Sequence, residues 1–185
     1  MKKILLGGLV GGLIFFAFQS LLWMSGFHND FYRQTANSKA ILDVLSTNLT
    51  DDGLYMLPSA NPNSPTKEKD QEEIMTYNYG QPWAMIFYHQ RMEGMSMSHL
   101  LIGLLYALLS GILVAFVLYS GTFDRFFYRF AVSMCFSFFG LIQGSLDEMN
   151  WFSYPWHYIK AEIIDLIFGW TLTSLWLAWY LYKSK

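Results

Sequence analysis

The chain has 185 residues, of which 54% are hydrophobic, 19% are aromatic and only 14% are charged. This composition excludes an ordinary soluble domain, and the length excludes a large transporter. A net charge of -2 supplies no basic face for nucleic acid, and the single cysteine, Cys135, excludes an intrachain disulfide. We therefore expect one membrane domain with a modest exposed insert.

The first of four apolar stretches follows Lys2 and Lys3 and continues to Met24. It is longer than the core of a secretory signal, and no small-residue cleavage site follows it, so we interpret 1–27 as an uncleaved first transmembrane helix. The other three stretches are 98–119, 126–146 and 159–182, all within 96–185. Each is about the length that a helix needs to cross roughly 30 Å of hydrocarbon.

Small and polar residues recur three or four positions apart within these stretches, which indicates the faces where the helices pack together. They are Gly7, Gly8, Gly11 and Gly12; Gly103, Ala107, Ser110, Gly111 and Ala115; Ser133, Ser137, Gly140 and Gly144; and Glu162, Asp165, Gly169 and Thr173. The predicted fold class is an all-α membrane protein, a four-transmembrane-helix bundle with a small α+β extracytoplasmic insert between helices 1 and 2.

The insert is predicted over 28–95. Asn37 and Ser38 precede apolar residues at helical spacing, and Asp51-Asp52-Gly53 ends that helix. The segments 54–57 and 83–89 have the composition of strands, and we expect them to pair as a two-stranded hairpin. Residues 60–73 contain too little apolar surface to order themselves, so they are predicted to be a mobile loop.

The basic residues of the short segments indicate the orientation. Lys2, Lys3, Arg125, Arg129, Lys183 and Lys185 flank the ends that an even number of spans places on one side, whereas the predicted turn 147–158 on the opposite side is acidic. Both termini are therefore predicted to be cytoplasmic, in a multi-pass protein of a bacterial inner membrane.

With this topology, all four histidines and a group of acids fall on the outer side. The histidines are His28, His89, His99 and His157, and the acids are Asp147, Glu148, Glu162 and Asp165. Carboxyl groups inside a membrane are costly unless they face protein or water, so this outer-mouth cluster is the first candidate site. It would hold a shared proton, bind a cation or act as acid and base; alternatively, it pairs with Lys160, Arg91 or backbone donors and is structural.

A second candidate is the run from Met92 to His99. Thioether sulfurs beside an imidazole are soft ligands that select Cu(I), so Met92, Met95, Met97, His99 and His157 are the candidate metal ligands. Methionine is equally a common filler at a membrane boundary, and packing is the alternative explanation. Copper is the one cofactor that this pattern suggests.

Motifs for other chemistries are absent from the sequence, including a phosphate-binding loop, a His-Glu-x-x-His helix and a Gly-x-Ser-x-Gly elbow. An aspartyl pair of Asp147 and Asp165 would resemble the layout of four-span lipoprotein signal peptidases. That resemblance is limited to topology, because the motifs that surround the family's aspartates do not surround these two residues. The shared topology still makes an intramembrane aspartyl hydrolase the second alternative function.

Four short segments carry a wider resemblance. They are Gly53-Leu54-Tyr55-Met56-Leu57-Pro58, Met95-Ser96-Met97, Asn150-Trp151-Phe152-Ser153-Tyr154-Pro155 and Gly169-Trp170. With them the chain resembles a group of small four-span bacterial inner-membrane proteins with no assigned activity. The resemblance implies the topology and carries over no catalytic residue.

These observations favour a structural or partner-binding function over an enzyme. We expect an accessory or assembly role through the extracytoplasmic insert, with membrane lipid and a protein partner or a second copy of the chain as binding partners. Metal handling, or transport of a small solute or ion at the outer cluster, is the alternative.

Overall fold

The computed structural model describes residues 1–183, and of Lys183 it describes the backbone alone. The described part of the chain is about 70% helical, and it contains four helices long and apolar enough to span a membrane and one small two-stranded sheet. It divides into two compact units, a helical unit of 1–33 and 95–185 and an insert unit of 34–94. The insert predicted over 28–95 differs from the second unit only at its edges, because residues 28–33 and residue 95 belong to the helical unit.

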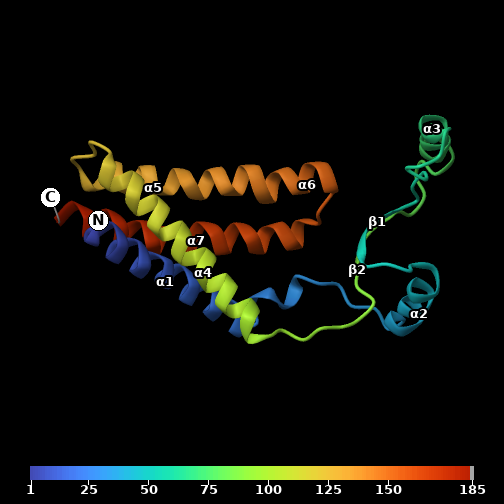
Figure 1. Ribbon diagram of the computed structural model, residues 1–185, viewed down its shortest axis with the longest axis horizontal. Helices are drawn as coiled ribbons and strands as arrows, with labels where there is room; N and C mark the ends of the chain where they lie inside the picture. Colours follow the sequence, from blue (N-terminus) through green and yellow to red (C-terminus); the bar gives the residue numbers. More distant parts are fainter. Residues whose placement is uncertain (184–185) are drawn as a thin grey trace. The chain divides into compact units, whose positions relative to one another are not determined.

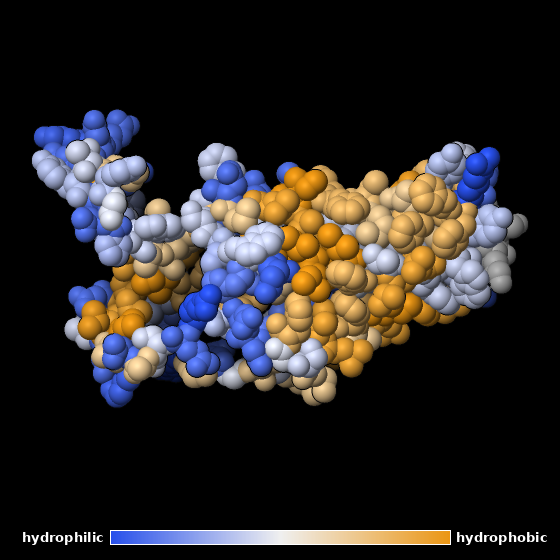
Figure 2. Space-filling model, turned by 180° about the vertical axis from the view of Figure 1, so that it is seen from behind, coloured by the Kyte–Doolittle hydropathy of each residue, from blue (hydrophilic) through white to orange (hydrophobic). Residues whose placement is uncertain are grey.

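The helical unit contains α1 (Lys2–Met24), η1 (Phe27–Asp30), α4 (Met97–Ser120), α5 (Phe126–Leu141), η2 (Ile142–Leu146), α6 (Asp147–Phe152) and α7 (Trp156–Lys183). Helix α1 packs along α4 and α7, and α5 packs along α7 (Figure 1). Hydrophobic residues dominate the surface of the middle of this unit (Figure 2). The four predicted apolar stretches are therefore confirmed as long helices.

Helices α5, η2 and α6 form one continuous helix from Phe126 to Phe152, which differs from the sequence-based expectation. The segment 147–158 was predicted to be a turn, but the connection to α7 is only 153–155. The helix ends because Ser153 adopts a left-handed conformation with φ of 54°, and Pro155 then leads into α7. A π-helical segment at 142–146 lies just before the two acids of α6.

Close backbone approach explains the glycines of α1. A Cβ atom on Gly12 would lie 2.5 Å from the carbonyl oxygen of Ala107, and one on Gly8 would clash with the backbone of Ile112. Gly111 on α4 faces the backbone of Gly8 in the same way. In a membrane, where water exclusion does not drive helices together, such close contact supplies the packing attraction. The predicted role of these small residues as a packing face is thus confirmed.

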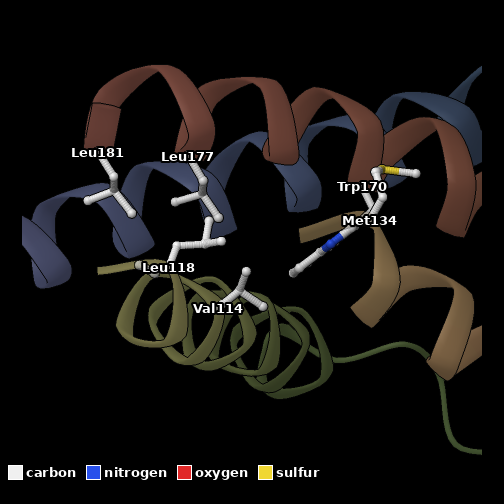
Figure 3. Close-up of a cluster of buried hydrophobic side chains, with 7 residues drawn as sticks. Val114, Leu118, Met134, Trp170, Leu177 and Leu181 are labelled. Carbon is white, nitrogen blue, oxygen red and sulfur yellow. The ribbon is translucent and has the colours of Figure 1, made fainter. Parts of the chain in front are cut away.

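Buried apolar side chains from α4, α5 and α7 form the core of the helical unit. Figure 3 shows Val114 and Leu118 of α4 meeting Leu177 and Leu181 of α7, with Met134 and Trp170 beside them. Leu118, Leu177 and Leu181 are completely buried. Because interiors are close-packed, this layer fixes the lateral position of the helices relative to one another.

The insert unit contains α2 (Ser38–Asn48), β1 (Gly53–Leu57), α3 (Lys67–Tyr77) and β2 (Ala84–Tyr88). The strands pair antiparallel, from Gly53 opposite Tyr88 to Leu57 opposite Ala84, as the sequence predicts. Helix α2 also forms where its apolar spacing predicts it. Tyr88 is the only buried residue in the 34–94 segment, all of which is described.

Helix α3 corrects the expectation that 60–73 has no regular structure. Its sequence is rich in lysine and glutamate, which are good helix formers even without apolar neighbours. The hydroxyls of Ser64 and Thr66 donate hydrogen bonds of 2.8 and 3.1 Å to Asp70, which hold the first turn, and Lys69 lies 3.8 Å from Glu73. The low hydrophobicity of this segment therefore leaves α3 without buried residues, but it does not prevent the helix from forming.

Candidate functional site

The candidate site begins where α1 ends. Gly26 adopts a left-handed conformation with φ of 77°, which glycine reaches without steric cost, and the chain turns into η1. This turn places the ring of His28 parallel to that of Trp23, with 4.3 Å between ring centroids and 6° between planes. His28 is consequently 6% exposed, the only buried residue of η1.

His28 is paired with Asp165 of α7. Its Nε2 atom lies 3.0 Å from Oδ2 of Asp165, and the two side chains are 4% and 7% exposed. One proton shared between these atoms makes the hydrogen bond. The other polar atom of each group, Nδ1 of His28 and Oδ1 of Asp165, is buried without a hydrogen-bond partner. Such a half-satisfied polar pair is uncommon in folded proteins and calls for a reason.

Aromatic rings enclose the pair. The Phe27 and Phe31 rings contact His28 edge-on, with centroid distances of 5.4 and 5.9 Å. The ring of Phe31, the residue that follows η1, lies 4.2 Å from the Tyr158 ring of α7, so the segment 27–31 is joined to α7 by ring packing as well as by the hydrogen bond. The enclosure lowers the local dielectric constant, and this strengthens the electrostatic attraction within the pair.

Further acids lie near this pair. Glu162, half-buried one turn before Asp165, is within electrostatic reach of Asp165, of Glu148 on α6 and of His28. Partial burial, followed by the charge of Glu148, raises the pKa of Tyr154 in the connection between α6 and α7. Three of the four acids of the predicted outer-mouth cluster thus belong to one electrostatic group.

The fourth acid of that cluster, Asp147, is exposed at the start of α6, while Asp165 is buried against His28. The structural alternative named Lys160 and Arg91 as partners of the acids. Both are exposed, and the ion pair that Asp165 makes in the described part of the chain is with His28. The sequence thus identified the acid, and the structure identifies a different partner.

The four histidines occupy distinct surroundings. His89 belongs to the insert unit, where Nδ1 lies 3.7 Å from Oδ2 of Asp52 and both side chains are exposed. His99 caps α4, because its Nδ1 accepts a hydrogen bond from the backbone N–H of Ser96 at 3.2 Å and lies 2.8 Å from the Ser96 hydroxyl. His157 is half-buried in the first turn of α7. Of the four, His28 alone is buried against an acid.

Four of the five predicted copper ligands lie on the surface, and the fifth, His157, is half-buried. Met92, Met95 and Met97 are 101%, 81% and 69% exposed, and one ring nitrogen of His99 is engaged in capping. Among residues 1–183, no group of three or more His, Cys, Asp or Glu side chains has the arrangement of a metal site. The copper site stays a prediction.

Polar side chains also connect α5 and α1 to α7, at positions later in α7 than Asp165. The hydroxyls of Ser133 and Ser174 lie 2.8 Å apart, and Nε1 of Trp170 donates a 2.8 Å hydrogen bond to the Ser133 carbonyl. On the other side of α7, the hydroxyl of Thr173 and Nε1 of Trp176 donate to the carbonyls of Gly11 and Gly7. Of the predicted small and polar stripes, the α7 stripe faces the bundle throughout, whereas Ser110 and Gly140 are exposed.

A groove lies between the helices at mid-span, away from the charged groups. Its volume is about 220 Å³, and its walls are Phe15, Ser110, Leu113, Val114, Phe136, Ser137, Leu166 and Trp170. Only the two serine hydroxyls and the indole N–H are polar, and the indole N–H is already bonded. The groove therefore suits hydrocarbon rather than an ion.

Arg129 of α5 is the charged residue whose setting the sequence reasoning missed. We assigned it to a basic flank of the bundle, but it is 1% exposed, and its Nε and Nη1 atoms have no hydrogen-bond partner. Its spacing of four residues from Ser133 and eight from Ser137 could have revealed that it shares their buried face.

No family model, curated protein or solved structure matches the chain. The resemblance to small four-span inner-membrane proteins therefore remains a prediction from short sequence segments.

Proposed function

We propose that the protein is an integral protein of a bacterial inner membrane, with four transmembrane helices and both termini in the cytoplasm, and that it serves as an accessory or assembly factor. Its extracytoplasmic insert binds a protein partner. The observation that carries this proposal is the near absence of a core in the 34–94 unit, where Tyr88 alone is buried.

The four long helices support the membrane placement. Each is long and apolar enough to cross a bilayer, and large apolar side chains such as Leu105, Leu113 and Phe139 are half or more exposed on them. In water such a surface would aggregate, whereas in lipid it is solvated. The distribution of charge supports the orientation, since Lys2 and Arg125 lie at helix ends opposite to Asp147 and Glu148.

The insert unit supports a binding function because it folds without burying its apolar residues. Helix α2 has no buried residue, and Ile41, Leu42 and Val44 are 48%, 58% and 63% exposed on it. These three side chains share one side of the helix, while Lys39, Asp43 and Thr47 lie on the other. An amphipathic helix whose apolar side remains open is typical of a surface that a partner covers.

The hairpin adds to this argument. Cross-strand pairing brings Leu54 opposite Phe87 and Met56 opposite Met85, and Leu54, Met56 and Phe87 are all more than half exposed. A lone two-stranded hairpin is at best marginally stable in water. A partner that covers the apolar surface would therefore stabilise the unit when it binds.

Photo-crosslinking tests the proposal. A photoreactive amino acid at Val44, on the apolar side of α2, should yield a discrete adduct in intact membranes, and the same group at Thr47, on the polar side, should not. An adduct of twice the chain's mass identifies a second copy as the partner. Equal labelling from both positions, or none from Val44, contradicts the proposal.

Ion transport at the outer-mouth acids is a second candidate function, favoured by the unpartnered Oδ1 of Asp165 within the α7 span and the unpartnered Nδ1 of His28 in η1, just beyond the end of α1. Proton flux through the purified protein in liposomes tests it. Asp165→Asn should abolish the flux while Asp147→Asn, at an exposed position, should retain it; no flux in the unaltered protein would eliminate this candidate.

A further inference from the structure

The end of the helical unit where α5 begins carries a buried charge that the proposed function does not use. Arg129 is 1% exposed, and its Nε and Nη1 atoms are enclosed without a hydrogen-bond acceptor. Arginine cannot lose its proton in a protein, so this side chain is a permanent cation at a place of low dielectric constant. An enclosed cation of this kind requires an anion close to it.

The described part of the chain offers no such anion to Arg129. Its ion pairs join His28 with Asp165, Lys39 with Asp43, Lys69 with Glu73 and His89 with Asp52. Asp124, the acid closest to Arg129 in the sequence, is exposed and makes none of these pairs. Within residues 1–183, the guanidinium therefore has no paired carboxylate.

The N-terminus of α5 supplies the rest of an anion site. The helix starts at Phe126, its N-cap residue Arg125 makes no side-chain capping hydrogen bond, and no acid lies in its first turn. The first backbone N–H groups of a helix have no partner within the helix, and together with the helix dipole they attract anions. Arg129 is the fourth residue of α5, and long side chains in a helix generally extend back toward its N-terminus.

The contacts between α5 and α7 give the depth of this site. The Ser137 hydroxyl bonds the Leu166 carbonyl, and the hydroxyls of Ser133 and Ser174 bond each other, so α5 and α7 run antiparallel. Arg129 lies one turn before Ser133 and is therefore level with the last turns of α7. Lys2, at the start of α1, lies at the same end of the unit (Figure 1). This is the depth at which lipid headgroups meet the ends of spanning helices.

We infer that Arg129 and the N-terminus of α5 bind a phosphate group, and that in the membrane this phosphate belongs to the headgroup of an anionic phospholipid. The guanidinium donates to phosphate oxygens in a forked geometry that suits arginine, and the free N–H groups of the first turn donate to the same group. Free phosphate has the same chemistry, and the test distinguishes the two sources.

Thermal unfolding of the detergent-purified full chain provides the test, with three additives: an anionic phospholipid, a diacylglycerol that lacks phosphate, and inorganic phosphate. The phospholipid should raise the unfolding temperature, and diacylglycerol should not. Arg129→Gln should lose most of this increase, while Arg91→Gln, an exposed arginine of the insert unit, should keep it. An equal increase with inorganic phosphate would assign the site to a free anion and overturn the lipid assignment.

Arg129→Lys is a second variant that keeps the test decisive if Arg129→Gln fails to fold. It retains the charge but not the fork, so it should bind the phospholipid more weakly than the unaltered chain and more tightly than Arg129→Gln. Native mass spectrometry gives the same comparison as the fraction of chains that retain a lipid. Equal retention by the unaltered chain and both Arg129 variants overturns the inference.

Discussion

Nε2 of His28 lies 3.0 Å from Oδ2 of Asp165, although 137 residues separate the two in the sequence. The contact joins the segment that follows α1 to the first half of α7. Since both side chains are buried, neither can exchange its partner for water without a change in the structure.

Removal of either member of this pair should destabilise the helical unit. Asp165→Ala leaves the buried imidazole without its partner and should lower the free energy of unfolding by about 1 to 3 kcal/mol. A double-mutant cycle with His28→Ala, measured by unfolding in mixed micelles, should give a coupling energy of about 0.5 to 3 kcal/mol.

The exposed pair of Lys39 and Asp43 is the control for that cycle. Their side chains are 87% and 63% exposed, so the same cycle should give no more than about 0.5 kcal/mol. A coupling energy for His28 and Asp165 as small as this would mean that the buried hydrogen bond does not contribute to stability.

The crossing of α1 and α4 should be sensitive to a single methyl group. Gly111→Ala places a Cβ atom against the backbone of Gly8 and Gly12, which cannot move aside as a side chain would. We expect a loss of about 1 to 3 kcal/mol in the free energy of unfolding. Gly144→Ala is the matched control, because no atom lies within 4 Å of its added Cβ; equal stability of both variants would contradict the close crossing.

Trp170→Phe should separate hydrogen bonding from packing in the core. The substitution keeps a ring beside Met134 but removes the N–H that bonds the Ser133 carbonyl at 2.8 Å. The expected loss in the free energy of unfolding is about 1 kcal/mol, since hydrogen bonds within membranes contribute modestly. Trp156→Phe, at a residue of the same helix that is 61% exposed, provides the comparison.

The isolated insert, residues 34–94, should lack a cooperative unfolding transition. With Tyr88 as its one buried residue, it buries too little apolar surface to offset the loss of chain entropy. Circular dichroism during heating should show a gradual change. A sharp transition would show that the unit is stable without a partner and would weaken the proposed binding function.

The sequence by itself determined the four long helices and the strand pair of this protein. Long apolar stretches predict spanning helices because a backbone in hydrocarbon must satisfy its hydrogen bonds internally, and helices do this locally. The strand pair was predictable for a related reason, since short β-rich segments beside turn residues pair with their neighbours. Apolar content alone was misleading at α3, whose charged residues still favour a helix.

Only the tertiary structure decided which polar groups meet. The sequence marked Asp165 as a costly charge and placed His28 on the same side, but the turn at Gly26 and the stacking of Trp23 select this histidine among four. Arg129 was read as a basic flank, and its burial follows from the antiparallel register of α5 and α7. Both outcomes have one physical reason: a side chain's partner depends on contacts between distant segments, and local sequence patterns do not contain the register of those contacts.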